Sequence, residues 1–347
     1  MSQARLKQSG LFILSLIISL GALYVLIRGD IDVLQDEIAD GRYGYTVPTV
    51  ILFVLGLIAR GYRWRVLLGY KTTTWHAFHI MNVGYMLNNL PLRVGELARA
   101  WMTTRLTPPI AFFTSISSIV VERLLDLAAV VVLLSISLIL LDVPQFWTGV
   151  GVAVGAITII GFSMLIYFAH HRELPHRILS WAMRRMRPLQ RLNLVEWLDH
   201  FLDGLEPLTN ARLRTEAIAW TIIAWALSVI SGYVLMLVFF EEGNWGAIML
   251  TIVMLALAIA IPAMPGNLGT FEAAGVAGLW LAGVIEAISA PENAPALAFA
   301  VLLHAITIAG YILLGMVGLW SEQLSVSQLR AGVQSTTDDT IAPAAPT

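Results

Sequence analysis

The most constraining feature of this sequence is a series of apolar stretches that are each long enough to cross a membrane. One helical crossing of the hydrocarbon core needs about 20 mostly apolar residues. We predict full spans at residues 11–27, 47–58 with continuation to 64, 110–141, 146–168, 217–240 and 296–320. Because the chain is 58% hydrophobic and only 13% charged, it has more apolar surface than a water-soluble chain of this length buries. The sequence therefore predicts an all-α, polytopic transmembrane helix bundle.

The ends of the first two spans carry the signals that place them in the membrane. Basic residues precede the first span, and no small-residue cleavage site precedes Arg28, so we predict an uncleaved span and not a cleaved signal peptide. The second span runs into Arg63 and Trp64. Aromatic and basic residues are typical of the membrane–water interface, so we expect both side chains at the membrane edge.

The distribution of Lys and Arg predicts the orientation. With the N-terminus in the cytoplasm, nearly all of the 21 Lys and Arg residues lie on the cytoplasmic side; Arg28 and Arg42 lie outside and Arg123 lies within a span. We therefore predict two cytoplasmic termini, which requires an even number of crossings. The six full spans satisfy this only if two further apolar stretches, 76–90 and 247–263, return to the side from which they enter.

The rest of the chain predicts one membrane domain with a polar loop and a tail. We expect residues 1–330 to form a single integral membrane domain, with a cytoplasmic amphipathic loop at 170–216 and a disordered tail at 331–347. The chain has no cysteine, so disulfides and thiolate metal sites are excluded, and we expect no metal and no cofactor. The net charge of −2 gives no reason to expect a nucleic-acid partner.

Two interrupted apolar segments, 86–99 and 261–272, share an unusual pattern. The first has Pro91 and Gly95 four residues apart, the second has Pro265 and Gly269 at the same spacing, and a glutamate follows each pair. Proline breaks a helix, and the freed backbone groups must then face protein or a water-filled cavity. Paired breaks of this kind are typical of the binding site of an inverted-repeat transporter. The alternative is two ordinary Pro-Gly turns at the interface.

Three charged residues, Glu122, Arg123 and Asp126, fall inside the predicted span 110–141. Each charge at the centre of a membrane helix costs about 2.5–3.5 kcal/mol, so such residues are usually functional. Glu122 and Asp126 share a helix face and Arg123 can pair with Asp126. The remaining carboxylate requires a cation, which Arg93 or Arg99 supplies if the first broken segment packs alongside. The alternative is that this span begins late and the charges lie near the interface.

Together these residues predict a polar groove that binds a substrate. The arginines would hold a phosphate group, the carboxylates would balance them or receive a cationic group, and the asparagines would supply neutral hydrogen bonds. We read His304, alone on an apolar helix, as a hydrogen-bonded packing residue. No phosphate-binding loop, HExxH motif or nucleophile elbow is present, so we assign no catalytic residue. The predicted substrate-binding residues are Asn88, Asn89, Arg93, Gly95, Glu96, Arg99, Glu122, Arg123, Asp126, Pro265, Gly266, Asn267, Gly269 and Glu272.

Three motifs in this order resemble a known family. They are Asn-Asn-Leu-Pro-Leu-Arg-Val-Gly-Glu-Leu-Ala-Arg at 88–99, Glu-Arg-Leu-Leu-Asp at 122–126 and Pro-Gly-Asn-Leu-Gly-Thr-Phe-Glu at 265–272. From about residue 11 to 320 the chain resembles the lysylphosphatidylglycerol synthase transmembrane-region family. That family includes the flippase half of the bacterial multiple peptide resistance factor, an archaeal member linked to dolichol-phosphate sugar transfer, and many flippase-like proteins.

The resemblance implies a flippase-like plasma-membrane protein. Its substrate would be an anionic or aminoacylated phospholipid, or a polyprenyl-phosphate carrier, moved between leaflets through a polar groove. No soluble aminoacyl-transferase domain follows the last span, so we expect a transport protein and not the complete synthase. The alternative is a membrane-embedded transferase that uses a polyprenyl-phosphate-linked sugar, with Glu122, Asp126 or Glu272 as base. Membrane lipids are the expected partners, and a monomer and an oligomer are both compatible with the sequence.

Overall fold

The computed structural model describes residues 21, 31–89, 94–141, 144–186, 193–260, 265–288, 293–325, 327–329 and 331–332. Within these residues all regular secondary structure is helical, which confirms the predicted fold class. Five helices in the described part are long and apolar enough to cross a membrane. The predicted first span at 11–27 lies outside the described residues apart from residue 21, and so does the tail from residue 333 onward.

The long helices coincide with the predicted spans. They are α3 (Thr46–Leu67), α6 (Phe112–Leu140), α7 (Phe146–His170), α11 (Ala211–Met236) and α14 (Ala294–Ser321). The two broken segments and the apolar runs before them form four shorter helices: α4 (Thr74–Asn88), α5 (Gly95–Thr103), α12 (Trp245–Ala260) and α13 (Thr270–Leu281). The remaining elements are α2 (Ile31–Asp40), η1 (Tyr43–Tyr45), α8 (Glu173–Arg185), α9 (Leu194–Asp203), α10 (Glu206–Thr209) and η3 (Pro265–Asn267).

Helices α4 and α5 form the first hairpin. At its tip the backbone N–H of Gly95 donates to Asn88 Oδ1 at 2.9 Å, and Gly84 of α4 lies against the stem of Arg99 of α5. At its base, Ala77 of α4 and Met102 of α5 belong to one apolar cluster together with the end of α3. The hairpin therefore returns to the end of the molecule from which it begins.

Helices α12 and α13 form the second hairpin. Gly278 of α13 packs directly on Thr251 of α12, and Gly275 lies near Leu255. The start of α12 and the end of α13 belong to one apolar cluster that also contains the end of α11 and the start of α14. This base lies at the end of the molecule opposite to the base of the first hairpin, so the two hairpins point toward each other.

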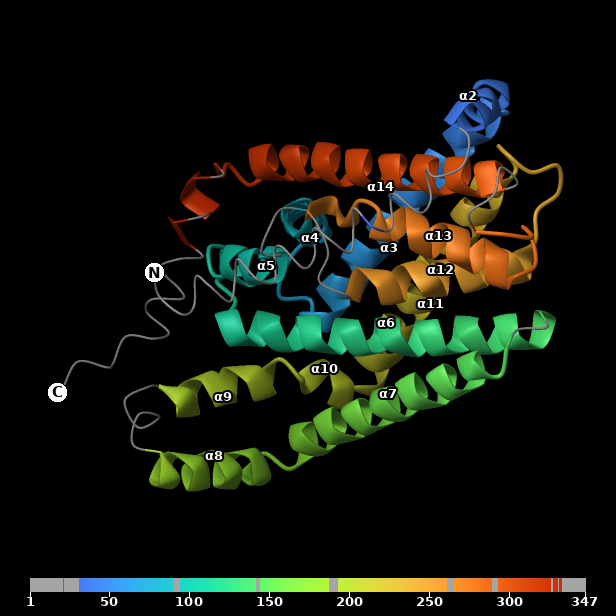
Figure 1. Cartoon of the computed structure of the whole chain (residues 1–347). Helices are drawn as coiled ribbons and strands as arrows, with labels where there is room; N and C mark the ends of the chain where they lie inside the picture. The colour runs from blue at the N-terminus through green and yellow to red at the C-terminus, as the bar shows by residue number, and fades with distance from the viewer. Residues whose placement is uncertain are drawn as a thin grey trace, which may run out of the picture.

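The helices form two groups of four, α3–α6 and α11–α14, which we call quartets. The two quartets have the same order of helices and run in opposite directions. Helices α3 and α11 pack antiparallel: Ser231 donates to the carbonyl of Thr49 at 3.1 Å at one end, and Tyr62 stacks on Trp220 at the other. In both quartets a long helix is followed by a hairpin and a second long helix, and α4 packs on α14 as α12 packs on α6. In Figure 1 both hairpins lie between α14 and α6, with α4–α5 on the left and α12–α13 on the right. This arrangement is that of an inverted repeat.

The helices between the quartets lie outside this arrangement. Helix α7 packs on α6, where Gly151 and Gly155 face Leu134 and Val131. The polar segment that follows folds into α8, α9 and α10, and Arg172 pairs with Asp203 at 2.7 Å. Helix α9 lies beside the start of α6, as Figure 1 shows. Helices α7 and α9 therefore pack on α6 on the side away from the hairpins, as Figure 1 shows.

Candidate functional site

A cavity of about 500 Å³ lies where the tips of the two hairpins approach each other. Its volume is in the range of pockets that hold small ligands. Residues of α3, α6, α11 and α14 complete its wall. The polar and aromatic lining residues are Arg60, Tyr85, Asn88, Asn89, Glu96, Arg123, Asp126, Trp225, Asn267, Phe271, His304, Thr307 and Tyr311. The apolar lining residues are Leu127, Val130, Ala256, Leu257, Ile259 and Ile308.

Behind this wall, Arg99 of α5 and Glu122 of α6 form a fully buried ion pair. The guanidinium makes two parallel contacts with the carboxylate, at 3.2 Å from Nη1 to Oε1 and 2.8 Å from Nη2 to Oε2. Arg99 also lies over the ring of Trp64, 4.3 Å from its centroid. Bidentate geometry and cation–π contact are the arrangements that best compensate a buried guanidinium. Arg99 supplies the cation that the sequence required for Glu122, and it holds α5 against α6.

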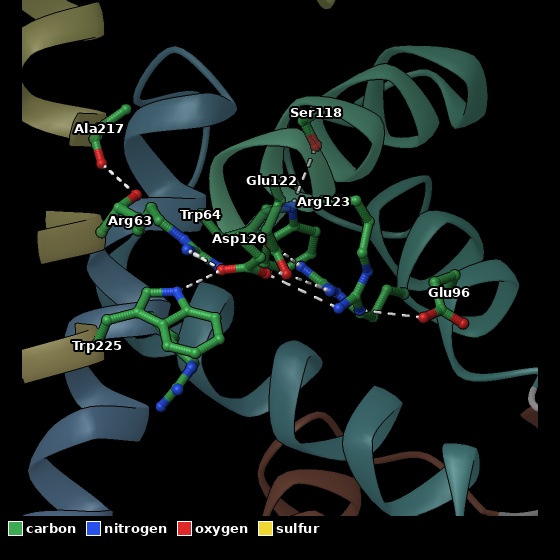
Figure 2. A network of polar contacts seen from close by, with 12 residues as sticks. Arg63, Trp64, Glu96, Ser118, Glu122, Arg123, Asp126, Ala217 and Trp225 are labelled. Atoms are coloured by element: carbon green, nitrogen blue, oxygen red, sulfur yellow. Dashed lines mark hydrogen bonds and ion pairs between the residues drawn. The ribbon is translucent and has the colours of Figure 1, made fainter. Parts of the chain in front are cut away.

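Arg63 of α3 is a second buried cation, and together with Arg99, Glu122, Arg123 and Asp126 it forms a charged network. Its Nη1 atom lies 2.6 Å from Asp126 Oδ1 and its Nη2 atom lies 3.6 Å from Glu122 Oε1. Trp225 donates to the same Asp126 oxygen at 3.0 Å, as Figure 2 shows. Arg63 and Trp64, which we expected at the membrane edge, are both 0% exposed, so their side chains face protein. The two carboxylates of α6 compensate the loss of hydration of Arg63.

The indole of Trp64 is buried for a related reason. Its Nε1 atom donates to Ser118 of α6 at 3.1 Å, so the polar end of the side chain has a partner inside the protein. Buried tryptophan is stable when its N–H finds such a partner. Trp64 of α3 thus contacts Arg99 of α5 and Ser118 of α6 beside the charged residues.

Arg123 joins the charged network to the first hairpin tip. Its Nη2 atom lies 3.1 Å from Glu96 Oε1, and its Nη1 atom lies 3.8 Å from Asp126 Oδ2, which confirms the predicted pairing within α6. Asn88 donates to the same Glu96 oxygen at 3.1 Å. The side chain of Arg123 is 47% accessible although it lies inside a spanning helix, because it faces the cavity. Figure 2 shows Arg123 between Asp126 and Glu96.

The second hairpin tip is built on a glutamate that caps its own helix. Glu272 Oε2 accepts the backbone N–H of Gly269 at 2.7 Å, and its Oε1 atom lies 2.7 Å from Nδ1 of His304 on α14. The rings of Phe271 and His304 stack 4.1 Å apart. Gly266 and Gly269 have φ angles of 71° and 81°, which favour glycine. The predicted hydrogen-bonded role of His304 is confirmed, but this residue also lines the cavity.

The structure thus brings both broken segments to one cavity. Some of the predicted site residues line this cavity, and others lie behind its wall. Asn88, Asn89, Glu96, Arg123, Asp126 and Asn267 line the cavity. Gly95, Arg99, Glu122 and Glu272 lie behind it and hold the hairpins, and Gly266 and Gly269 shape the second tip. Arg93 lies outside the described residues, and only the backbone of Pro265 is described.

Sequence reasoning missed several residues of this wall. Arg60, Tyr85, Trp225 and Tyr311 line the cavity without having been predicted. One sequence feature could have indicated Arg60. Two arginines, Arg60 and Arg63, lie one helical turn apart at the end of an apolar run, so they fall within the length of a membrane span. Among the described residues, no group of three or more His, Asp or Glu side chains is placed to hold a metal ion.

Comparison with known proteins identifies the family. Residues 12–315 match the family described as the lysylphosphatidylglycerol synthase TM region. Comparisons of the chain with curated proteins and with solved structures gave no match. The family match covers most of the 347 residues and includes both hairpins and the charged network. The protein belongs to the lysylphosphatidylglycerol synthase transmembrane-region family.

Proposed function

We propose that the protein is a flippase-like transporter that moves a phospholipid or a lipid-linked carrier between the leaflets of a membrane. The observation that carries this proposal is the polar cavity of about 500 Å³ between two opposed hairpin tips. The helices around it are long and apolar enough to cross a membrane. A charged cavity at this position is expected of a transporter, because charged groups inside membrane proteins usually line substrate pathways.

The cavity wall offers what a lipid head group needs during passage. A head group loses its hydration in hydrocarbon at a large cost unless protein groups replace the water. The amides of Asn88 and Asn89 and the charged groups of Arg123 and Glu96 line the cavity, and these groups would replace the water. Leu257, Ile259 and Ile308 give the same cavity an apolar part, against which the start of the acyl chains would pack.

We propose further that the protein lies in the plasma membrane with both termini in the cytoplasm. In this orientation the first hairpin enters from the cytoplasm and the second from outside. The opposite positions of the two hairpin bases support this arrangement. The chain has no native cysteine, so single cysteines are suitable probes of its topology. An impermeant thiol reagent should label Arg105→Cys, just after α5, only from the cytoplasm and Glu242→Cys, just before α12, only from outside, and labelling of both from one side would contradict the topology.

The transport proposal is tested with the purified full chain in liposomes. Fluorescent phosphatidylglycerol, phosphatidylcholine and a polyprenyl phosphate are placed in both leaflets, and dithionite then quenches the label in the outer leaflet. We expect a larger quenched fraction than in protein-free liposomes for at least one anionic lipid. The proposal fails if no lipid, polyprenyl phosphates included, moves faster. Product formation from a polyprenyl-linked sugar in detergent, where leaflets do not exist, would instead indicate a transferase.

A cavity-filling substitution gives this assay a matched control. Ala256 lines the cavity, whereas Ala153 lies on the exposed face of α7. We expect Ala256→Trp to lower the rate of lipid movement at least tenfold because the indole occupies part of the head-group space. Ala153→Trp should leave the rate unchanged. Equal rates in both variants would show that lipid does not pass through this cavity.

A further inference from the structure

Arg60 differs from the other charged residues of the cavity wall because its partner is uncharged. Its Nη2 atom donates to Ser228 Oγ at 2.9 Å. Within the described part of the chain, no carboxylate oxygen lies within 4.0 Å of its guanidinium nitrogen atoms. In contrast, Glu96, Arg123 and Asp126 all take part in ion pairs. The positive charge of Arg60 at the cavity wall is therefore not neutralised by these ion pairs.

The position of Arg60 follows from the antiparallel packing of α3 and α11. Arg60 precedes Arg63 by three residues on α3, and Ser228 follows Trp225 by three residues on α11. The two helices thus meet in two neighbouring layers. In one layer Arg63 and Trp225 both contact Asp126, which supplies a negative charge. In the other layer Ser228 orients Arg60 but, as a hydroxyl, does not neutralise it.

The other carboxylates of this region already have partners. Glu96 pairs with Arg123, Asp126 with Arg63, and Glu122 with Arg99. Glu272 accepts from the Gly269 N–H and contacts His304. A positive group in the cavity would have to share carboxylates that already contact an arginine or His304. A negative group would complete the environment of Arg60, because an unpaired charge within a membrane protein strongly favours a counter-ion.

We propose that Arg60, oriented by Ser228, holds the phosphodiester of the substrate, and that the cavity therefore selects a lipid head group of net negative charge over an aminoacylated, cationic one. This inference rests on the proposed function, because it places a lipid head group in the cavity. It narrows the substrate class to anionic lipids. The hydroxyls of Tyr85 and Tyr311, whose ring centroids lie 5.0 Å apart at the cavity wall, are further donors for the phosphate oxygens.

Binding to the purified full chain in detergent tests this inference separately from transport. The ligands are short-chain phosphatidylglycerol, short-chain lysylphosphatidylglycerol and inorganic phosphate. We expect the wild-type protein to bind phosphatidylglycerol at least tenfold more tightly than the lysyl form. Arg60→Gln should weaken phosphatidylglycerol binding by about tenfold or more, the usual effect of losing a charge-assisted hydrogen bond. Arg60→Lys, which keeps the charge, should retain part of the affinity.

Arg65→Gln is the matched control. Arg65 lies on the same helix but outside the cavity, where it donates to the carbonyl of Thr72 at 3.0 Å. This variant should bind phosphatidylglycerol like the wild type. If Arg60→Gln does not fold, Ser228→Ala decides, because it keeps Arg60 but removes its orienting partner; a severalfold loss of affinity supports the inference and unchanged affinity overturns it.

The remaining outcomes separate the inference from the proposed function. The inference is overturned if Arg60→Gln binds phosphatidylglycerol as tightly as the wild type, or if the wild type prefers the lysyl form. Inorganic phosphate that binds as tightly as phosphatidylglycerol would show that a soluble anion, and not a lipid, is recognised. If phosphatidylglycerol binds through Arg60 but no lipid moves in liposomes, the proposed transport fails while the assignment of Arg60 stands.

Discussion

The two hairpin tips have the same architecture but different chemistry. Each ends in a break after which a new helix begins, and each new helix has a glutamate in its first turn, Glu96 in α5 and Glu272 in α13. Glu96 contacts Arg123 on α6, and Glu272 contacts His304 on α14, the corresponding long helix of the other quartet. The repeat thus preserves the position of the glutamate but changes its partner from a guanidinium to an imidazole.

This difference changes the kind of contact that holds each tip. A guanidinium forms two parallel hydrogen bonds with a carboxylate, whereas an imidazole nitrogen forms one. The first tip lies in a network of three arginines and three carboxylates, whereas Glu272 of the second tip contacts the Gly269 N–H and His304. The first hairpin is therefore held by several ion pairs, and the second by a backbone cap and one contact to α14.

The largest expected effect comes from removing the buried cation of the first tip. Arg99→Met leaves the carboxylate of Glu122 with only the longer contact to Arg63, at 3.6 Å. Breaking a buried ion pair typically costs about 3–5 kcal/mol. We therefore expect a loss of stability of this size, measured as thermal unfolding in detergent. An unchanged unfolding temperature would contradict the view that this pair holds the first hairpin.

A smaller effect is expected at the second tip. Glu272→Gln keeps a side-chain oxygen that accepts the Gly269 N–H, but it removes the negative charge beside His304. A hydrogen bond to a charged group contributes about 1.5–3 kcal/mol, and the amide retains part of this. In the same assay the loss should be clearly below that of Arg99→Met. A loss as large as that of Arg99→Met would mean that the two tips are held equally by charge.

The smallest effect on stability is expected for Arg123→Gln. This side chain is 47% accessible, and exposed ion pairs contribute about 0–1 kcal/mol. Lipid movement in liposomes should nevertheless fall severalfold, because the variant removes a cavity cation that contacts Glu96. Arg172→Gln, which removes an exposed pair with Asp203 outside the cavity, is the matched control. Equal transport by both variants would remove Arg123 from the proposed pathway.

The sequence predicted the features that depend on local pattern. Apolar length identified the five long helices of the described residues, and the Pro-Gly spacing pointed to the two hairpins. The intramembrane charges of α6 indicated that the first hairpin packs beside it. The sequence did not predict the burial of Arg63 and Trp64, because their partners, Asp126 and Ser118, lie on another helix more than 50 residues away. Nothing in the local sequence distinguishes an arginine at a membrane edge from one that meets a distant carboxylate.

The short length of the hairpin helices has a consequence for the energy barrier to lipid movement. Helices α4 and α12 have 15 and 16 residues, and at about 1.5 Å per residue neither crosses a hydrocarbon layer of about 30 Å. Each hairpin therefore extends only part of the way from its own end of the molecule, and the two tips meet at the cavity. In the transport that we propose, a head group would lose its hydration over a shorter distance than in lipid alone.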